Sequence, residues 1–155
     1  ESSVFSSEFT EIKTAPVICY ESVYGDYVAS YVRKGANLIF VITNDGWWDN
    51  TPGYKQHMAY SRLRAIETRR SIARAANTGI SCFINQRGDV LQTTGWWQAT
   101  AIKGVLNAND EMTVFAKAGN YIGRLASFLA LGLIIYSFVR SKKDASFVKI
   151  GRAQV

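Results

Sequence analysis

Two short apolar runs of strand length constrain the fold of this chain more than any other feature. Residues 15–20 combine apolar and β-branched side chains and are expected to form a buried strand. Residues 37–43 lack any alternation of polar and apolar side chains, which predicts a strand buried on both faces, as in parallel sheets. Between the two runs, residues 21–34 carry apolar side chains at helical spacing and stop at Gly35, which favours a helix end.

The second half of the chain continues this alternation of strands and helices. Residues 44–54 are expected to form a loop, with Pro52 placed to open a helix over residues 55–76. The face of that helix that turns to the core is expected to carry Ala59, Leu63, Ile66, Ile72, Ala73 and Ala76. Further strands are expected at residues 79–85, 90–94 and 98–106.

Strands that alternate with helices define the α/β class with a layered sheet. Residues 1–13 are polar and are expected to form a connection. Residues 14–118 can bury a core, but three strand–helix units would leave a small and open sheet. We therefore expect one half of a larger sandwich. The 48% of apolar residues excludes a disordered chain.

A charge-free stretch at residues 125–139 is short for a membrane span, which needs about 20 residues. Extending it back to Gly119 gives 21 residues and includes Arg124, whose side chain can reach the headgroups from a helix end. Tyr121 and Tyr136 lie near the two ends, as interfacial aromatics do. The sequence therefore predicts a transmembrane helix, with a buried core helix as the alternative.

The charge of the chain divides it into three segments. The net charge is +6, and residues 140–155 hold five basic residues against one acidic residue. By the positive-inside rule we expect a basic cytoplasmic tail at 140–155, a transmembrane helix at 119–139 and an extracytoplasmic domain at 1–118.

A second basic cluster is expected to form a solvated helix face on which Glu67 pairs with Arg64 or Arg70. Its members are Arg62, Arg64, Arg69, Arg70 and Arg74. No nucleic-acid-binding motif accompanies the basic residues, so nucleic acid is not an expected partner.

Cys19 is the residue most suggestive of chemistry. It ends the first apolar run just before a turn and a helix, at the sheet edge where open α/β folds place their sites. A thiolate there would be favoured by the helix N-terminus, whereas the alternative is a buried, inert thiol. Cys82 lies within an apolar strand and is expected to be structural, and both thiols are expected to be free. His57 is expected to be a surface or capping residue, with a Cys19–His57 pair as a weaker alternative.

The loop after the second strand should reach the same sheet edge as Cys19. Asn44, Asp45 and Trp47 are therefore predicted as substrate-binding residues. The alternative is that Asn44 and Asp45 only order the loop through bonds to its backbone. The sequence contains no cluster of Cys and His residues, so no metal site is expected.

Three blocks that follow one another carry a resemblance to a known family: APVICYES from residue 15, ITNDGWWDNTPGYKQH from residue 42 and RLRAIETRRSIARAANTGISCFINQRGDV from residue 62. Together they resemble the carbon–nitrogen hydrolase (nitrilase) superfamily, and more closely its membrane branch, the apolipoprotein N-acyltransferases. The resemblance spans residues 15–139. It implies the C-terminal part of a nitrilase-like α-β-β-α sandwich followed by one transmembrane helix.

The resemblance also implies an activity. Members of this branch move an acyl chain from a phospholipid, through a cysteine thioester, to the diacylglyceryl-cysteine of a lipoprotein. Cys19 would be the nucleophile, the Tyr20 amide would help to hold the oxyanion and Glu21 would help to position the site. The implied location is the bacterial inner membrane, multi-pass in the full protein, with the catalytic domain in the periplasm. No metal or organic cofactor is implied.

The chain departs from the family in one respect. The family's triad is Glu, Lys and Cys, and Glu8, Glu11 and Lys13 are wrongly placed to supply the first two. The sequence is therefore interpreted as the C-terminal portion of an acyltransferase, lacking the triad Glu and Lys. A membrane-tethered amidase or nitrilase-like hydrolase, and a non-catalytic module that docks at the membrane, remain as alternatives.

Overall fold

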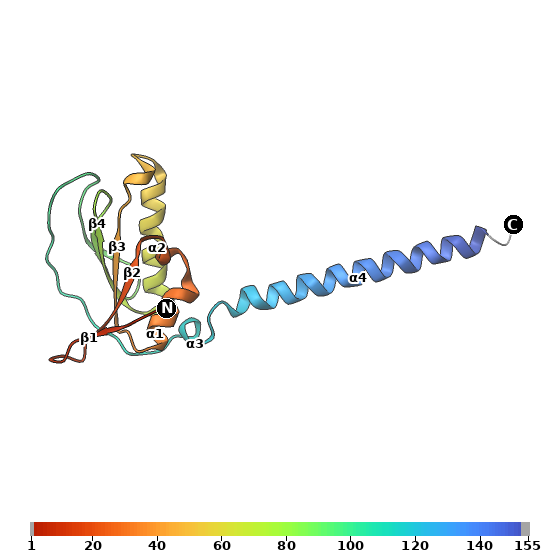
Figure 1. Ribbon diagram of the computed structural model, residues 1–155, viewed down its shortest axis with the longest axis horizontal. Helices are drawn as coiled ribbons and strands as arrows, with labels where there is room; N and C mark the ends of the chain where they lie inside the picture. Colours follow the sequence, from red (N-terminus) through yellow and green to blue (C-terminus); the bar gives the residue numbers. More distant parts are fainter. Residues whose placement is uncertain (1, 153–155) are drawn as a thin grey trace. The chain divides into compact units, whose positions relative to one another are not determined.

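A computed structural model describes residues 2–152 of the chain, and the side chains of residues 2–141 (Figure 1). The chain divides into two compact units, and the boundary between them in the sequence lies between Gly119 and Asn120. The first unit holds a six-stranded sheet with helices, and the second is a single long helix. The two units are described separately below.

Within its described residues, the first unit contains six strands, two 3₁₀ turns and three α-helices. The strands are β1 (Phe5–Ser6), β2 (Lys13–Ile18), β3 (Leu38–Thr43), β4 (Ser71–Ala76), β5 (Cys82–Ile84) and β6 (Val90–Thr93). The 3₁₀ turns are η1 (Cys19–Val23) and η2 (Gly46–Trp48), and the helices are α1 (Gly25–Arg33), α2 (Pro52–Thr68) and α3 (Val114–Ala118).

The sheet is mixed, and its parallel part is at the centre. Strands follow one another in chain order from β1 to β6; β2, β3 and β4 are mutually parallel, and the other pairings are antiparallel. Ile18 pairs with Ile42, and Ile42 pairs with Ala75. The carboxyl ends of β2, β3 and β4 therefore meet at one edge of the sheet. The predicted α/β class is confirmed.

The two faces of the sheet have different surroundings. Figure 1 shows α1 and α2 on the same side of the sheet, and Val17, Ile39 and Val41 are buried towards them. Phe40 and Ile42 alternate with these residues along β3 and are about half exposed. The predicted burial of this strand on both faces is therefore not complete within the described residues. An apolar sheet with one covered face is the arrangement expected of one half of a sandwich.

The helix expected over residues 55–76 is shorter, and this part of the prediction was wrong. α2 ends at Thr68, Arg69 adopts a left-handed backbone with φ of 52°, and residues 71–76 form β4. The alanines and arginines of this segment favour a helix locally. Pairing with β3 along six residues overrides that preference.

The face of α2 that turns inward also differs from the prediction. Leu63 and Ile66, assigned to the core face, are 41% and 43% exposed. The buried face instead carries Tyr54, His57, Ser61, Arg64, Ala65 and Thr68. Most of these side chains are polar, so this face is specified by hydrogen-bond partners on other elements.

The predicted arginine helix face is corrected in the same way. Arg70 and Arg74 lie outside α2, and both are buried, as is Arg64. Arg64 does pair with Glu67, at 3.2 Å. Arg70 donates to the carbonyl oxygens of Ala36, Thr68 and Glu111. Three of the five arginines are therefore buried in the protein interior.

Smaller differences concern the ends of the sheet. The polar start of the chain contributes β1, and residues 98–106 form no strand. The helix expected over residues 21–34 is divided into η1 and α1. As predicted, the helical segment stops at Gly35, whose φ is 95°. Cys82 is fully buried in β5, and both cysteines are free.

Among the described residues, the second unit contains the helix α4 (Tyr121–Arg152). Within Tyr121–Ser141, an 18-residue window has a mean hydropathy of 1.9, and this stretch is long and apolar enough to cross a membrane. Its apolar side chains are exposed, in contrast to the alternative of a buried core helix. The helical backbone continues into the basic tail as far as Arg152. The tail's side chains beyond Ser141, and residues 153–155, lie outside the described residues.

The core of the first unit can be tested with a matched pair of valines. Val41 is 1% exposed in β3, whereas Val105 is 91% exposed. Val41→Ala should lower the free energy of unfolding by about 2 kcal/mol, because two methyl groups are lost and a cavity remains. Val105→Ala should change it by less than about 0.5 kcal/mol. Urea unfolding of both variants measures the difference, and equal losses would contradict this placement of the core.

Candidate active site

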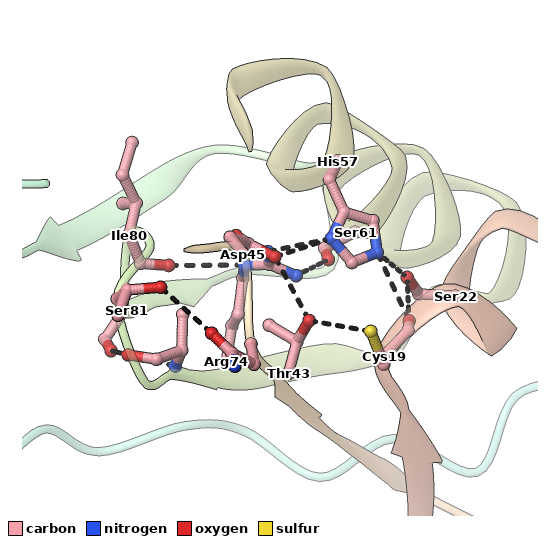
Figure 2. Close-up of polar contacts among 12 residues, drawn as sticks. Cys19, Ser22, Thr43, Asp45, His57, Ser61, Arg74, Ile80 and Ser81 are labelled. Atoms are coloured by element: carbon pink, nitrogen blue, oxygen red, sulfur yellow. Dashed lines mark hydrogen bonds and ion pairs between the residues drawn. The ribbon is translucent and has the colours of Figure 1, made fainter. Parts of the chain in front are cut away.

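Cys19 lies in a strained turn at the carboxyl end of β2. Its φ is 50°, a left-handed conformation that is uncommon for a residue with a side chain. The turn is held through the Cys19 carbonyl oxygen, which accepts a hydrogen bond from Ser22 Oγ at 2.8 Å. His57 Nε2 lies 3.2 Å from the same oxygen and 3.1 Å from Ser22 Oγ (Figure 2). Side chains from η1 and α2 thus fix the backbone of the cysteine.

The sulfur of Cys19 contacts the neighbouring strand. Thr43 is the last residue of β3, and its Oγ1 lies 3.2 Å from Cys19 Sγ. The same hydroxyl lies 3.1 Å from Asp45 Oδ1. This contact follows from the parallel register, which brings the ends of β2 and β3 side by side. Cys19 as a residue is partly exposed, while Thr43 contacts its sulfur from the protein side.

Asp45, His57 and Arg74 form a buried charged cluster beneath the cysteine. Asp45 Oδ1 lies 2.8 Å from His57 Nδ1, and Oδ2 accepts from Arg74 Nη2 at 2.5 Å. Burial alone would raise the pKa of Asp45, but the hydrogen bond from His57 and the charge of Arg74 outweigh it and lower this pKa below its usual value. Arg74 also donates to Ser61 Oγ and to the Ile80 carbonyl oxygen. The carboxylate is thus held ionised inside the protein.

Gly79 is required for this cluster to form. It is buried, and a Cβ at this position would collide with the side chain of Asp45. The glycine lies in the connection between β4 and β5. Its backbone therefore packs directly against the Asp45 side chain.

Tyr20 and Glu21 follow Cys19 within η1. Glu21 Oε2 accepts from the Ile18 backbone N–H at 2.8 Å, and Oε1 accepts from the Tyr27 hydroxyl at 3.1 Å. The carboxylate thereby ties the end of β2 to α1. Tyr20 is 52% exposed, and the centroid of its ring lies 6.0 Å from that of the His57 ring. Tyr20 therefore borders the accessible side of the turn.

The three loop residues predicted for substrate binding have different surroundings. Asn44 Oδ1 accepts from the Gly46 backbone N–H and from Thr78 Oγ1, so Asn44 orders the loop. Asp45 is fully buried, and both of its oxygens are engaged within the protein. Trp47 is 84% exposed. Of the three, Trp47 is the side chain that faces solvent freely.

The acidic and basic residues near the start of the chain lie away from Cys19. Glu8 and Glu11 are exposed in the connection between β1 and β2. Lys13 begins β2, whereas Cys19 follows its last residue. At about 3.3 Å per residue, the two are separated by about 20 Å. This agrees with the expectation that none of the three residues supplies the triad.

The sequence interpretation missed the roles of His57, Thr43 and Arg74. His57 is 1% exposed, so the prediction that it lies at the surface is wrong. It contacts the Cys19 carbonyl oxygen, whereas the sulfur contacts Thr43. One signal was available: Thr43 directly precedes the Asn-Asp pair at the end of a strand predicted to be parallel to that of Cys19. Arg74 had no such signal, because it was assigned to a helix.

The cluster makes a prediction for acid stability. The pKa of Asp45 is lowered by folding, so its charge contributes stability that is present above the unfolded pKa of about 3.9 and is lost as the pH falls through the folded value. Asp45→Asn should lower the free energy of unfolding at pH 7 by about 3 kcal/mol, because Arg74 loses its buried partner. The variant should also lose part of the acid dependence below pH 4.

Denaturant unfolding between pH 7 and pH 3 measures both effects. Asp89→Asn is the matched control, because the Arg87–Asp89 pair is exposed and should contribute less than about 1 kcal/mol. Equal effects of the two substitutions would contradict the buried cluster.

The two thiols should differ in reactivity. Burial raises the pKa of Cys82 to about 11, so about one molecule in a thousand carries this thiolate at pH 8. Iodoacetamide should therefore label Cys19 well before Cys82, as read by peptide mass spectrometry of the folded protein. Cys82→Ala should leave the labelling unchanged, and Cys19→Ala should remove it. Preferential labelling of Cys82 would show that the turn is closed to reagents.

Comparison with known proteins places this geometry in a family. The family model described as carbon-nitrogen hydrolase matches residues 1–110. An apolipoprotein N-acyltransferase from Chlorobaculum tepidum is 34% identical over 131 residues, covering 84% of this chain and 25% of that protein. One from Allorhizobium ampelinum is 48% identical over 79 residues, covering 51% and 15%.

A mutant of an amidase of the nitrilase superfamily from Nesterenkonia has a similar fold. Its TM-score is 0.51 at 20% identity, over 61% of this chain and 37% of the amidase. The chain spans about a quarter of the length of the Chlorobaculum relative. The resemblance inferred from the three sequence blocks is confirmed. The chain belongs to the carbon–nitrogen hydrolase family and is similar to its apolipoprotein N-acyltransferases over most of its length.

Proposed function

We propose that this chain carries the nucleophile of an enzyme that transfers a fatty acyl chain from a phospholipid to the diacylglyceryl-cysteine of a lipoprotein. The observation that carries the proposal is the turn of Cys19. It has a strained backbone at the end of a parallel strand, and side chains from η1, β3 and α2 hold its carbonyl oxygen and its sulfur. Strain that several elements maintain is typical of a functional site. Similarity to apolipoprotein N-acyltransferases supports the choice of substrates.

The proposed reaction has two halves. In the first, the Cys19 thiolate attacks the ester carbonyl of the phospholipid, the ester C–O bond breaks, and the lysophospholipid leaves as an alkoxide that takes a proton from solvent. In the second, the lipoprotein α-amine attacks the thioester, the C–S bond breaks, and the amine loses a proton as the thiolate leaves. The backbone N–H of Tyr20 is proposed to stabilise the oxyanion in both halves. No general base is assigned among the described residues.

The other predicted residues take supporting roles in the proposal. Glu21 positions the turn through Ile18 and Tyr27. Asp45 acts from beneath the site, through His57 and Thr43, because its burial leaves no room for a direct substrate contact. Asn44 orders the loop that presents Trp47, whose exposed indole is suited to an acyl chain or a lipid surface.

The membrane arrangement is part of the proposal. Residues 119–139 would cross the bacterial inner membrane, with residues 1–118 in the periplasm and the basic residues 140–155 in the cytoplasm. The hydropathy of α4 supports the span, and the excess of basic residues after it supports the direction. The full protein would be multi-pass, as the resemblance implies.

An acyl-thioester on Cys19 is the expected intermediate. The full protein that carries this chain, incubated with phospholipid vesicles, should gain the mass of one fatty acyl group on the Cys19 peptide. Neutral hydroxylamine should remove that group, because a thioester is cleaved under these conditions. Cys19→Ala should abolish both the modification and transfer to a diacylglyceryl peptide, whereas Cys82→Ala should retain both.

Other outcomes favour the alternatives. Ammonia released from soluble amides, without acyl capture from lipid, would favour a membrane-tethered hydrolase. A folded protein whose Cys19 accepts neither acyl groups nor alkylating agents would favour a non-catalytic docking module. Normal transfer by Cys19→Ala would overturn the proposal.

A further inference from the structure

The hydroxyl of Thr43 lies between the proposed nucleophile and the buried cluster. Figure 2 shows Thr43 with one dashed line to the Cys19 sulfur and another to Asp45. The distances are 3.2 Å to Sγ and 3.1 Å to Oδ1. Thr43 is 7% exposed and ends β3, so its position is set by the sheet.

A threonine hydroxyl has one proton, so it can donate to only one of these partners at a time. While Cys19 is a neutral thiol, the Asp45 carboxylate is the stronger acceptor, and the hydroxyl oxygen can accept from the S–H group. When Cys19 is a thiolate, the negative sulfur becomes a competing acceptor. The hydroxyl can then turn to the sulfur, because His57 and Arg74 continue to donate to Asp45.

We propose that Thr43 is a positioning residue whose hydroxyl donates a hydrogen bond to the Cys19 thiolate and turns that hydrogen bond to Asp45 when the sulfur is acylated. No proton leaves either residue in this exchange; only the hydrogen bond changes its acceptor. When the sulfur lone pair forms the C–S bond of the thioester, the sulfur loses its charge and becomes a weak acceptor. The inference rests on the proposed function of Cys19. It adds a hydrogen bond that Thr43 makes to the sulfur in the free enzyme and to Asp45 in the acyl-enzyme.

The surroundings of the sulfur include charges of both signs. Asp45 follows β3, His57 comes from α2, Arg74 from β4, and Glu21 from η1 itself. The carboxylates of Asp45 and Glu21 are each engaged by donors, as described above. Among the described residues, Thr43 is the neutral donor within hydrogen-bond reach of Sγ, which makes it the residue to vary.

The test compares Thr43→Val, which keeps the shape and removes the hydroxyl, with Thr43→Ser, which keeps the hydroxyl. The rate at which iodoacetamide alkylates Cys19 is measured from pH 6 to pH 10 in the full protein that carries this chain, in detergent. Peptide mass spectrometry assigns the label. Thr93→Val serves as the matched control, because Thr93 is exposed in β6.

Thr43→Val should slow alkylation about 10- to 100-fold near neutral pH, which is the range expected for loss of a hydrogen bond to a charged group. Its rate should approach that of the parent at the alkaline end, so that the profile moves to higher pH. Thr43→Ser should restore most of the rate, and Thr93→Val should change nothing. Formation of the acyl-thioester from phospholipid should fall in the same order.

Three results would overturn the inference: a Val profile that matches the parent, a Ser variant as slow as Val, or a deficit equal at every pH. The last would indicate a structural loss, and unfolding temperatures measured in parallel identify it. Should Thr43→Val fail to fold, Thr43→Ala removes the same hydroxyl and gives the same comparison with Ser. If Thr43→Val slows alkylation but the protein forms no acyl-thioester, the hydrogen bond from Thr43 to the thiolate is supported and the proposed function is rejected.

Discussion

The buried ion pair between Asp45 and Arg74 is the interaction on which the rest of the site depends. Both side chains are completely buried, and an unpaired charge in that position would be strongly destabilising. The pair joins the end of β3 to β4, and His57 extends it to α2 and to the carbonyl oxygen of Cys19. Three elements that are distant in sequence, β3, β4 and α2, therefore meet at one carboxylate, and His57 links it to the turn of Cys19. The strained turn of Cys19 persists because this framework holds it from below.

The parallel register explains why these residues meet at all. β2, β3 and β4 run in one direction, so the residues that end them lie along one edge of the sheet. Cys19 and Thr43 become neighbours there although 24 positions separate them in the sequence. The edge thus combines a partly exposed sulfur, a hydroxyl and a buried charged cluster, an arrangement suited to covalent catalysis on a substrate that approaches from outside.

The sheet face opposite the helices adds a second aspect. Phe40 and Ile42 are about half exposed there, in β3, whose other face is buried through Ile39 and Val41. The chain belongs to the carbon–nitrogen hydrolase family and spans about a quarter of the length of the Chlorobaculum relative. One covered face and one apolar open face agree with the half sandwich inferred from the small number of strand–helix units. At the carboxyl ends of β2, β3 and β4, the described residues show how Cys19 is held in its turn. No general base is assigned among them.

Sequence alone determined the alternation of strands and helices, the position of Cys19 at a strand end and the apolar stretch of α4. Each of these depends on residues close together in the chain: an apolar run, a turn signal or a hydropathy maximum. Tertiary structure decided that residues 71–76 form a strand, that α2 turns a polar face inward and that His57 is buried. Polar side chains can be buried only where distant partners satisfy them, and a single sequence does not show which partners will meet.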